Sequence, residues 1–500
     1  MRARISRHLG SVLTAAPRAA APPVDDSLEL AGVLPARGPF LGPGPADAIG
    51  VDVPPEFNGH DYVVFLLRVA AEIEHSLMAQ YLFAAYSLGG PSVPAEQAEA
   101  VRAWQETILG VAKEEMGHLI TVQNLLTVLG APRQFDRDDY PNVSPLYPFG
   151  FRLEPLSLES LAAYVCAESP PEWDDEEARR IKAKAQADTG DVVNRVGELF
   201  EQLISLVERP SVVPDSAFQA RTVPFQATWD EWGRGYRQGQ RGAEAMSSLD
   251  LPAPELVILP VGSRAEALTA LRAVAEQGEG FETPPDENDS HFRRFLTIYR
   301  AFEALGDGIG DVVRPLARNP TTGDTDGGDA GDPDTPTTIT HPEARLWGHL
   351  FNVRYRKLLT NLSHAFELAD DPSDATTLTP RGALIHRTFS EMYNLRAIAG
   401  LMVRLPVSAD EPDGPRAGPT FQMPYTLALP SAEADRWRVH RDLLDASDRL
   451  IAALRTASPS GDGPDYLAAL AQWDDIERGH VEQLIAVPAP SPVPSPVPQP

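Results

Sequence analysis

The chain has 500 residues, a formal net charge of −28 and one cysteine, Cys166. This negative charge argues against nucleic acid or an anionic membrane surface as a partner. A single cysteine excludes an intrachain disulfide and a thiolate metal cage, so any metal must be bound by oxygen and nitrogen ligands. No apolar run is long enough to cross a bilayer, and a cytoplasmic protein is expected.

Composition divides the chain into two ordered blocks and three irregular segments. Residues 1–54 are rich in Pro, Gly and Ala, and residues 487–500 are rich in Pro, so neither is expected to pack. Residues 311–341 contain too few apolar residues for a core and are predicted to be a disordered linker. The blocks 55–310 and 342–486 show helical spacing of apolar residues. We therefore predict an all-α protein with an additional helical region at the C-terminus.

The first block contains five helical candidates. A short apolar stretch, ELVILPV, precedes the fourth of them and is either a strand or a buried connection. Long helices joined partly by long connections are typical of a four-helix bundle with crossovers. The candidates lie near 61–88, 100–130, 190–208, 264–279 and 290–305.

In the first candidate a carboxylate interrupts an apolar stripe. The stripe lacks its member at position 74, which is Glu74. Glu72 lies on another face and is predicted to be solvated, and His75 is expected at the surface or behind a ligand. Tyr81 is on the stripe itself; it is a core residue or a catalytic residue close to a metal. The stripe consists of Val63, Leu67, Ala70, Leu77, Tyr81, Ala84 and Leu88.

In the second candidate the apolar spacing continues through Glu115 and His118, which therefore point inward. A buried, unpaired carboxylate costs several kcal/mol or shifts its pKa, and a bound metal ion removes that penalty. The two side chains could instead be hydrogen-bonded to each other or to another helix. Glu114, one step round the helix, is predicted to be solvated. The surrounding stripe is Ile108, Val111, Val122, Leu125 and Leu129.

The later candidates carry further ionisable groups near their apolar faces. His291 extends the stripe of the fifth helix backwards, and Glu279 lies at the edge of the fourth stripe between two glycines. Those glycines permit an irregular backbone or simply end the helix. Periodicity alone predicts that Glu198 and Glu201 are solvated. A second Glu-x-x-His, formed by Glu477 with a histidine three residues later, lies in a charged segment and is interpreted as exposed.

Two-metal bundles combine one carboxylate from each of two helices with a Glu-x-x-His from each of the other two. The first block has one such motif, Glu115 with His118. Glu279 and His291 could supply the second mixed pair from a broken helix. Oxygen ligands together with imidazole favour iron or manganese over structural zinc.

Six motifs occur in an order that resembles the ferritin-like domain of the iminophenyl-pyruvate dimer synthase family, found in the imine-dimerising enzymes of violacein and rebeccamycin biosynthesis. The resemblance covers about residues 58–305. The motifs are AEIEHSLMAQYLFAAYSLGG, AKEEMGHLITVQNLLTVLGAP, YPFGFRLEPLSLESLAAYVCAESP, RVGELF, EQGEG and SHFRRF.

The resemblance implies a ferritin-like four-helix bundle with a dinuclear site that holds two iron ions, or manganese. On this basis Glu198 is the expected third-helix ligand, and Glu201 on the same helix is the alternative. The ligands that the resemblance implies are Glu74, Glu115, His118, Glu198, Glu279 and His291.

The expected function is that of a metal-dependent oxidoreductase in natural-product biosynthesis. It would use dioxygen or peroxide to oxidise a small organic substrate, such as an amino-acid-derived imine. Two alternatives are a ferroxidase or peroxide-handling protein and a non-catalytic scaffold. The C-terminal block would cover the bundle or pair subunits in a homo-oligomer.

Overall fold

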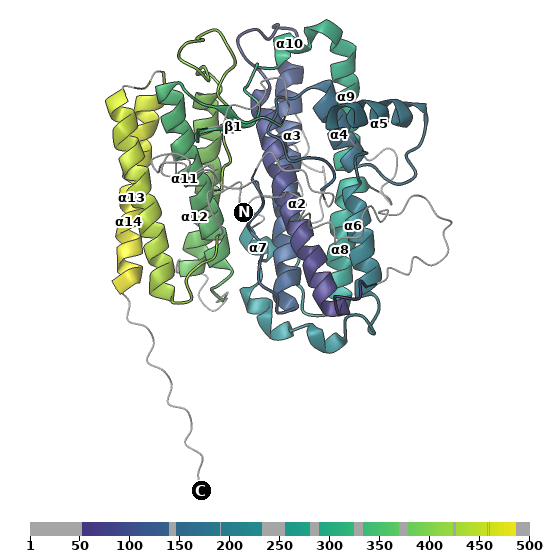
Figure 1. Cartoon of the computed structure of the whole chain (residues 1–500). Helices are drawn as coiled ribbons and strands as arrows, with labels where there is room; N and C mark the ends of the chain where they lie inside the picture. Colours follow the sequence, from purple (N-terminus) through teal and green to yellow (C-terminus); the bar gives the residue numbers. More distant parts are fainter. Residues whose placement is uncertain are drawn as a thin grey trace, which may run out of the picture.

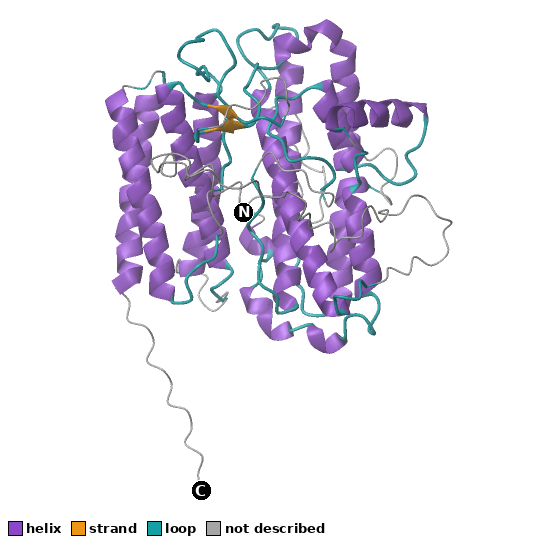
Figure 2. Ribbon diagram, in the orientation of Figure 1, coloured by secondary structure: helices purple, strands orange, loops and turns teal. Residues whose placement is uncertain are grey.

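The computed structural model describes most of the chain, and the architecture below refers to that part. It is all-α, as predicted, apart from one pair of two-residue strands (Figure 2). None of the helices in these ranges is both long and apolar enough to span a bilayer. The described residues are 53–139, 147–190, 192–232, 256–280, 290–324, 334–369, 379–423, 427–457, 459 and 461–486.

Two long helices form one side of the N-terminal bundle. Helix α2 (Gly59–Ser87) packs along α3 (Ala98–Val128), and both match the predicted ranges closely. The Asn58 side chain caps α2 by accepting a hydrogen bond from the Asp61 backbone N–H at 2.9 Å. Both helices bury one face along almost their whole length, so the periodic spacing of their apolar residues is easy to recognise in the sequence.

The other two positions of the bundle are each filled by two shorter helices. Helices α4 (Leu158–Ala167) and α6 (Val196–Val207) share one position, and α8 (Arg264–Glu279) and α9 (His291–Leu305) share the other. Helix α4 packs against α9, and α6 packs against α8. Figure 1 shows α4 above α6 and α9 above α8. The bundle therefore contains two continuous helices and two interrupted ones.

The interruptions have local causes. Two prolines, Pro170 and Pro171, follow α4 and prevent its continuation. Gly280 ends α8 in the left-handed conformation, with φ at 66°. Ser290 caps the start of α9 by accepting from the Arg293 backbone N–H. The ends created by these breaks lie in the interior of the bundle, so side chains at helix ends reach its centre.

Shorter elements connect these helices. The ELVILPV stretch forms no strand: its described residues run as a buried connection along α3, where Asn124 donates to the Leu259 carbonyl at 2.9 Å. The short elements are α5 (Glu176–Thr189), η1 (Asp215–Ala217), η2 (Ala220–Phe225), α7 (Trp229–Trp232), η3 (Gly306–Gly308) and α10 (Ile309–Val312).

The C-terminal region forms a second group of four helices beside the first (Figure 1). Its members α11 and α12 pack together, as do α13 and α14, and α11 also packs against α13. A hydrogen bond between His75 on α2 and Tyr355 on α11 joins the two groups. The four helices are α11 (Pro342–Ala365), α12 (Pro380–Met402), α13 (Glu433–Ala457) and α14 (Gly463–Ala486).

The predicted disorder of residues 311–341 is wrong for their described parts, 311–324 and 334–341. Strand β1 (Pro320–Thr321) pairs in parallel with β2 (Thr337–Thr338), between the two helical groups in Figure 2. The Gln422 side chain donates to the Thr321 hydroxyl at 2.7 Å. Polar residues of this segment form hydrogen bonds with residues far away in the sequence, and composition alone does not reveal such contacts. The predicted irregular ends, except residues 53 and 54, lie outside the described residues.

Candidate metal centre

The structure brings Glu74, Glu115 and His118 together in the interior of the bundle. All three are at least 98 % buried, and each offers one ligand atom within 4.8 Å of the others. His118 Nδ1 lies 3.2 Å from Glu115 Oε2 and 3.4 Å from Glu74 Oε2. The inward positions inferred from periodicity are therefore correct for these residues.

A second group shares Glu115 and adds Glu168 and His291, again with ligand atoms within 4.8 Å of one another. His291 Nδ1 lies 2.9 Å from Glu115 Oε1 and 3.6 Å from Glu168 Oε2. His291 is the first residue of α9, and Glu168 follows the last residue of α4. The broken helices thus bring one candidate ligand each to the centre, and Glu115 belongs to both groups.

Three potential ligand atoms, Glu74 Oε2, Glu115 Oε1 and His291 Nδ1, are buried and make no hydrogen bond of standard geometry within the described part of the chain. Their close neighbours belong to the same two groups, since His291 Nδ1 lies 2.9 Å from Glu115 Oε1 and His118 Nδ1 lies 3.4 Å from Glu74 Oε2. Buried polar atoms are almost always hydrogen-bonded, and exceptions mark functional sites or missing ions. With neutral imidazoles the two groups carry three negative charges, which divalent cations would balance.

Each imidazole presents Nδ1 to the centre and is held through Nε2. His118 Nε2 donates to Gln277 Oε1 at 2.9 Å, and His291 Nε2 donates to Glu114 Oε2 at 3.0 Å. Arg294 pairs with the same carboxylate. Hydrogen bonds of this kind fix ring orientation in metal sites. The prediction that Glu114 is solvated is wrong, because α9 covers this face of α3 and brings both partners to it.

The pKa values of the buried side chains show that the centre has an excess of negative charge. Burial alone would lower the pKa of His118, but its hydrogen bonds to Glu115 and Glu74 raise it to about 10. Burial likewise opposes protonation of His291, but the Glu115 charge and the hydrogen bonds to the surrounding carboxylates together raise the pKa well above its ordinary range. Burial and the neighbouring Glu115 raise the pKa of Glu74. Without metal, protons therefore serve as the neutralising cations.

Glu198 and Glu279, both implied as ligands, lie outside the two groups. Glu279 is buried, but both its oxygens pair with Arg195 at 3.1 Å. The Glu198 side chain is 26 % exposed and lies 3.4 Å from the same guanidinium. Glu201 is more exposed, as periodicity predicted, and its oxygen lies 3.7 Å from Arg195. One arginine thus engages all three carboxylates.

Tyr81 lies beside the centre, whereas His75 faces α11. The Tyr81 hydroxyl donates to Glu168 Oε1 at 2.6 Å, so this tyrosine contacts the metal-binding set directly. Its ring is also packed edge-on against Tyr164 at 4.8 Å. His75 is buried rather than at the surface, because α11 covers that side of α2. The catalytic role expected for Tyr81 stays a prediction.

Sequence reasoning missed Glu168 although a signal was present. Leu161, Tyr164 and Glu168 follow the 3–4 spacing of an inward stripe. Helix α4 has 10 residues, and the carboxylate lies one position beyond its end. The stripe was therefore too short to be recognised. Gln277, the partner of His118, carried no comparable signal.

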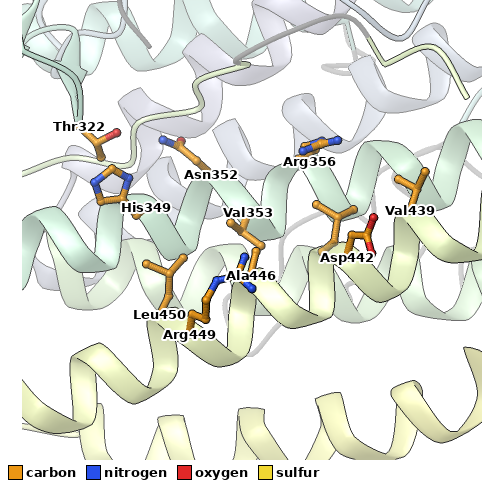
Figure 3. A pocket seen from close by; sticks show the side chains of 11 residues that line it. Thr322, His349, Asn352, Val353, Arg356, Val439, Asp442, Ala446, Arg449 and Leu450 are labelled. Atoms are coloured by element: carbon orange, nitrogen blue, oxygen red, sulfur yellow. The ribbon is translucent and has the colours of Figure 1, made fainter. Parts of the chain in front are cut away.

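A separate cleft of about 490 Å³ lies between α11 and α13 (Figure 3). Apolar residues such as Val353 and Leu450 line it together with Arg356 and Arg449. No residue of the two metal-binding groups contributes to it. Elsewhere in the C-terminal region Glu477 pairs with Lys357 rather than with a histidine.

Comparison with known families agrees with this geometry. The family described as Ferritin-like matches residues 67–300, which contain all five side chains of the two groups. Residues 67–300 are a ferritin-like domain, and the expected fold is confirmed.

The chain is also 26 % identical over 408 residues to Dichlorochromopyrrolate synthase from Lentzea aerocolonigenes. The match covers 75 % of this chain and 37 % of that protein, so the chain spans little more than a third of its relative's length. A crystal structure of a ferritin-like protein from Caulobacter vibrioides shares 17 % identity, with a TM-score of 0.36 over 67 % of this chain and 95 % of that one. The first two matches confirm the expected resemblance, which is to a ferritin-like domain and to a biosynthetic enzyme.

Proposed function

We propose that this protein is a dinuclear non-haem oxidoreductase that acts on a small organic substrate. The observation that carries the proposal is the pair of buried carboxylate and imidazole groups that share Glu115, with the ligand atoms of each group within 4.8 Å of one another. Oxygen-rich ligands with two imidazoles suit iron first and manganese second. The proposed ligands are Glu74, Glu115, His118, Glu168 and His291.

The protein's own residues would prepare this site for oxidation chemistry. Iron bound here would supply activation of dioxygen or peroxide. Glu114 and Gln277 orient the two imidazoles, and Tyr81 holds Glu168 through its hydroxyl. The apolar interior of the bundle excludes water, which protects reactive species from side reactions.

The relative supports the substrate class that we propose. Dichlorochromopyrrolate synthase is by its name a biosynthetic enzyme, and it matches three quarters of this chain. This supports a role in natural-product biosynthesis, with an amino-acid-derived imine as the first substrate to test.

The first experiment counts metal ions per chain in purified protein and in a Glu115→Ala, His118→Ala double variant. We expect about two iron or manganese ions in the parent, and loss of both from a variant that keeps its helical circular dichroism, because the shared carboxylate belongs to both groups. Absence of metal after anaerobic Fe(II) loading would contradict the proposal and favour a scaffold. Sustained oxidation of excess Fe(II), with no turnover of any imine, would favour a ferroxidase.

A further inference from the structure

The cleft between α11 and α13 has the size of a small-molecule site. Its volume of about 490 Å³ falls within the range of about 300–1,000 Å³ that is usual for such sites. Two small side chains, Val353 on α11 and Ala446 on α13, lie near its middle and leave this room (Figure 3). Leu443 and Leu450 of α13 add further apolar surface. The cleft therefore offers space and apolar walls for a molecule with a compact apolar body.

The charged residues of the lining leave an excess of positive charge. Arg356 and Arg449 contribute two guanidinium groups, and Asp442 contributes a single carboxylate. With His349 neutral, the lining therefore carries one net positive charge. Asp442 also lies 3.4 Å from Arg441, which is outside the lining. The whole chain has a net charge of −28, so this local excess is opposite in sign to the rest of the protein and favours an anionic ligand.

The two arginines that carry this charge differ in their surroundings. Arg449 is exposed, forms no ion pair with another described residue, and extends from α13 towards the middle of the cleft (Figure 3). Arg356 lies at the end near Asp442, where burial lowers the pKa of its guanidinium to about 10 although Asp442 opposes the shift. Because burial disfavours the charged form, a second negative charge would stabilise it. A carboxylate matches the planar fork of either guanidinium.

The opposite end of the cleft is held in place by hydrogen bonds. Asn352 Oδ1 accepts from the Gln422 backbone N–H at 3.1 Å, and the Thr322 hydroxyl donates to Gln422 Oε1 at 3.0 Å. Figure 3 shows Thr322 and Asn352 at this end, beside His349. These contacts form between protein groups alone, so this wall needs no rearrangement to receive a ligand, which lowers the cost of binding.

We propose that this cleft is a binding site separate from the metal centre, and that it binds a small organic acid with one carboxylate and an apolar body. The carboxylate pairs with Arg449 and Arg356, and the apolar body lies between Val353 and Ala446. A single negative charge balances the excess charge of the lining, whereas a phosphate with two charges does not. The cleft shares no residue with the metal-binding groups, so binding of the acid does not depend on the proposed centre.

The test is isothermal titration calorimetry of metal-free protein with phenylacetate, indole-3-acetate and octanoate, and with the amide of each acid. We expect one molecule of an acid to bind per chain, and its amide to bind about tenfold more weakly because it loses the charge-assisted hydrogen bonds. Arg449→Gln should weaken binding of the acid about tenfold and leave binding of the amide unchanged. Ala446→Leu should weaken binding of both, because the larger side chain fills the middle of the cleft.

Two other substitutions on α13 are matched controls. Arg438→Gln removes an exposed arginine that pairs with Asp435, and Ala452→Leu enlarges an exposed alanine. Neither residue lines the cleft, so both variants should bind the acid like the parent. The Glu115→Ala, His118→Ala variant should also bind it, which separates this site from the proposed metal centre. Circular dichroism verifies that every variant keeps its helices.

Three outcomes would overturn the proposal. The first is that none of the three acids binds to the parent. The second is binding that neither Arg449→Gln nor Ala446→Leu weakens, because the acid would then occupy another place. The third is tighter binding of phenyl phosphate than of phenylacetate, which would contradict a site for a single negative charge. None of these outcomes bears on the metal content of the protein, so the proposed function is tested independently.

Discussion

The two helical groups both bury carboxylates, but they neutralise them differently. In the C-terminal group Glu391 and Asp474 are buried with Arg354 and Lys357, whose charges are close: Lys357 lies 2.9 Å from Glu391, and Arg354 donates to Asp474 at 2.8 Å. In the N-terminal group the three carboxylates of the centre have only imidazoles among them. The C-terminal group thus neutralises its carboxylates with permanently charged side chains. The two groups of the N-terminal centre contain no such side chain, so protons or metal ions have to neutralise their carboxylates.

The pKa values express the same contrast. Burial alone would raise the pKa of Glu391, but Lys357 and Arg354 outweigh it and hold the pKa below its ordinary value. For Glu74, burial and a neighbouring carboxylate act together, and the pKa is raised. A buried carboxylate is thus structural where a fixed cation accompanies it. It is a candidate ligand where none does.

The largest expected effect is in the C-terminal group. Asp474→Asn removes one partner from a buried network and leaves Arg354 with less negative charge. Breaking a buried ion pair costs about 3–5 kcal/mol, so urea unfolding should show a loss of that size. Arg478→Ala removes more exposed pairs with Asp445 and Asp448 and should cost less than about 1 kcal/mol. Equal losses in both variants would contradict the comparison.

A pH effect should follow from His440, which is buried on α13 beside His364. Burial and the neighbouring cationic groups lower its pKa well below 6.5. Below pH 6.5 this histidine binds a proton in the unfolded chain but not in the folded protein. Its contribution to the free energy of unfolding therefore falls with falling pH, by up to about 1.4 kcal/mol per pH unit. Buried carboxyls with a raised pKa, such as Glu279, act in the opposite direction, so the test is a comparison with His440→Gln. Between pH 7 and 5 the free energy of unfolding of the parent should fall relative to that of His440→Gln; the same pH dependence in both proteins would contradict a role of His440.

Glu74→Gln should have the opposite sign from Asp474→Asn. The substitution replaces a buried carboxyl, whose ionised form is disfavoured by burial and by Glu115, with a permanently neutral amide. Metal-free protein should therefore gain about 1 kcal/mol of unfolding free energy, as is common when a functional residue is relieved of strain. The same variant should lose the stabilisation that added Fe(II) or Co(II) gives the parent. A metal-free variant less stable than the parent would remove the distinction between the regions.

The smallest expected effect is that of Tyr81→Phe. It removes the hydrogen bond from the hydroxyl to Glu168 and leaves the ring packing against Tyr164 unchanged. The loss of metal-free stability should be about 1 kcal/mol. Metal affinity should also fall, because Glu168 loses the group that orients it. Phe295→Leu, in the same aromatic cluster, is the control: it should change stability but not metal affinity.

Where a helix is long and continuous, the sequence by itself determined which side chains point inward. Glu74, Glu115 and His118 stand in stripes of α2 and α3 that extend over several turns, and all three lie at the centre. The all-α fold and the ferritin-like domain follow from the same periodicity and from separated motifs. A helical period fixes direction around an axis, so long stripes carry this information without any knowledge of neighbours.

Only the tertiary structure decided the rest of the site. Glu114 is buried because α9 brings His291 and Arg294 against it, and Glu168 reaches the centre from the end of a short, proline-terminated helix. Glu279 pairs with Arg195, which is 84 residues away in the chain. Periodicity describes one helix at a time, whereas the charge that neutralises a buried carboxylate comes from another helix and is set by packing.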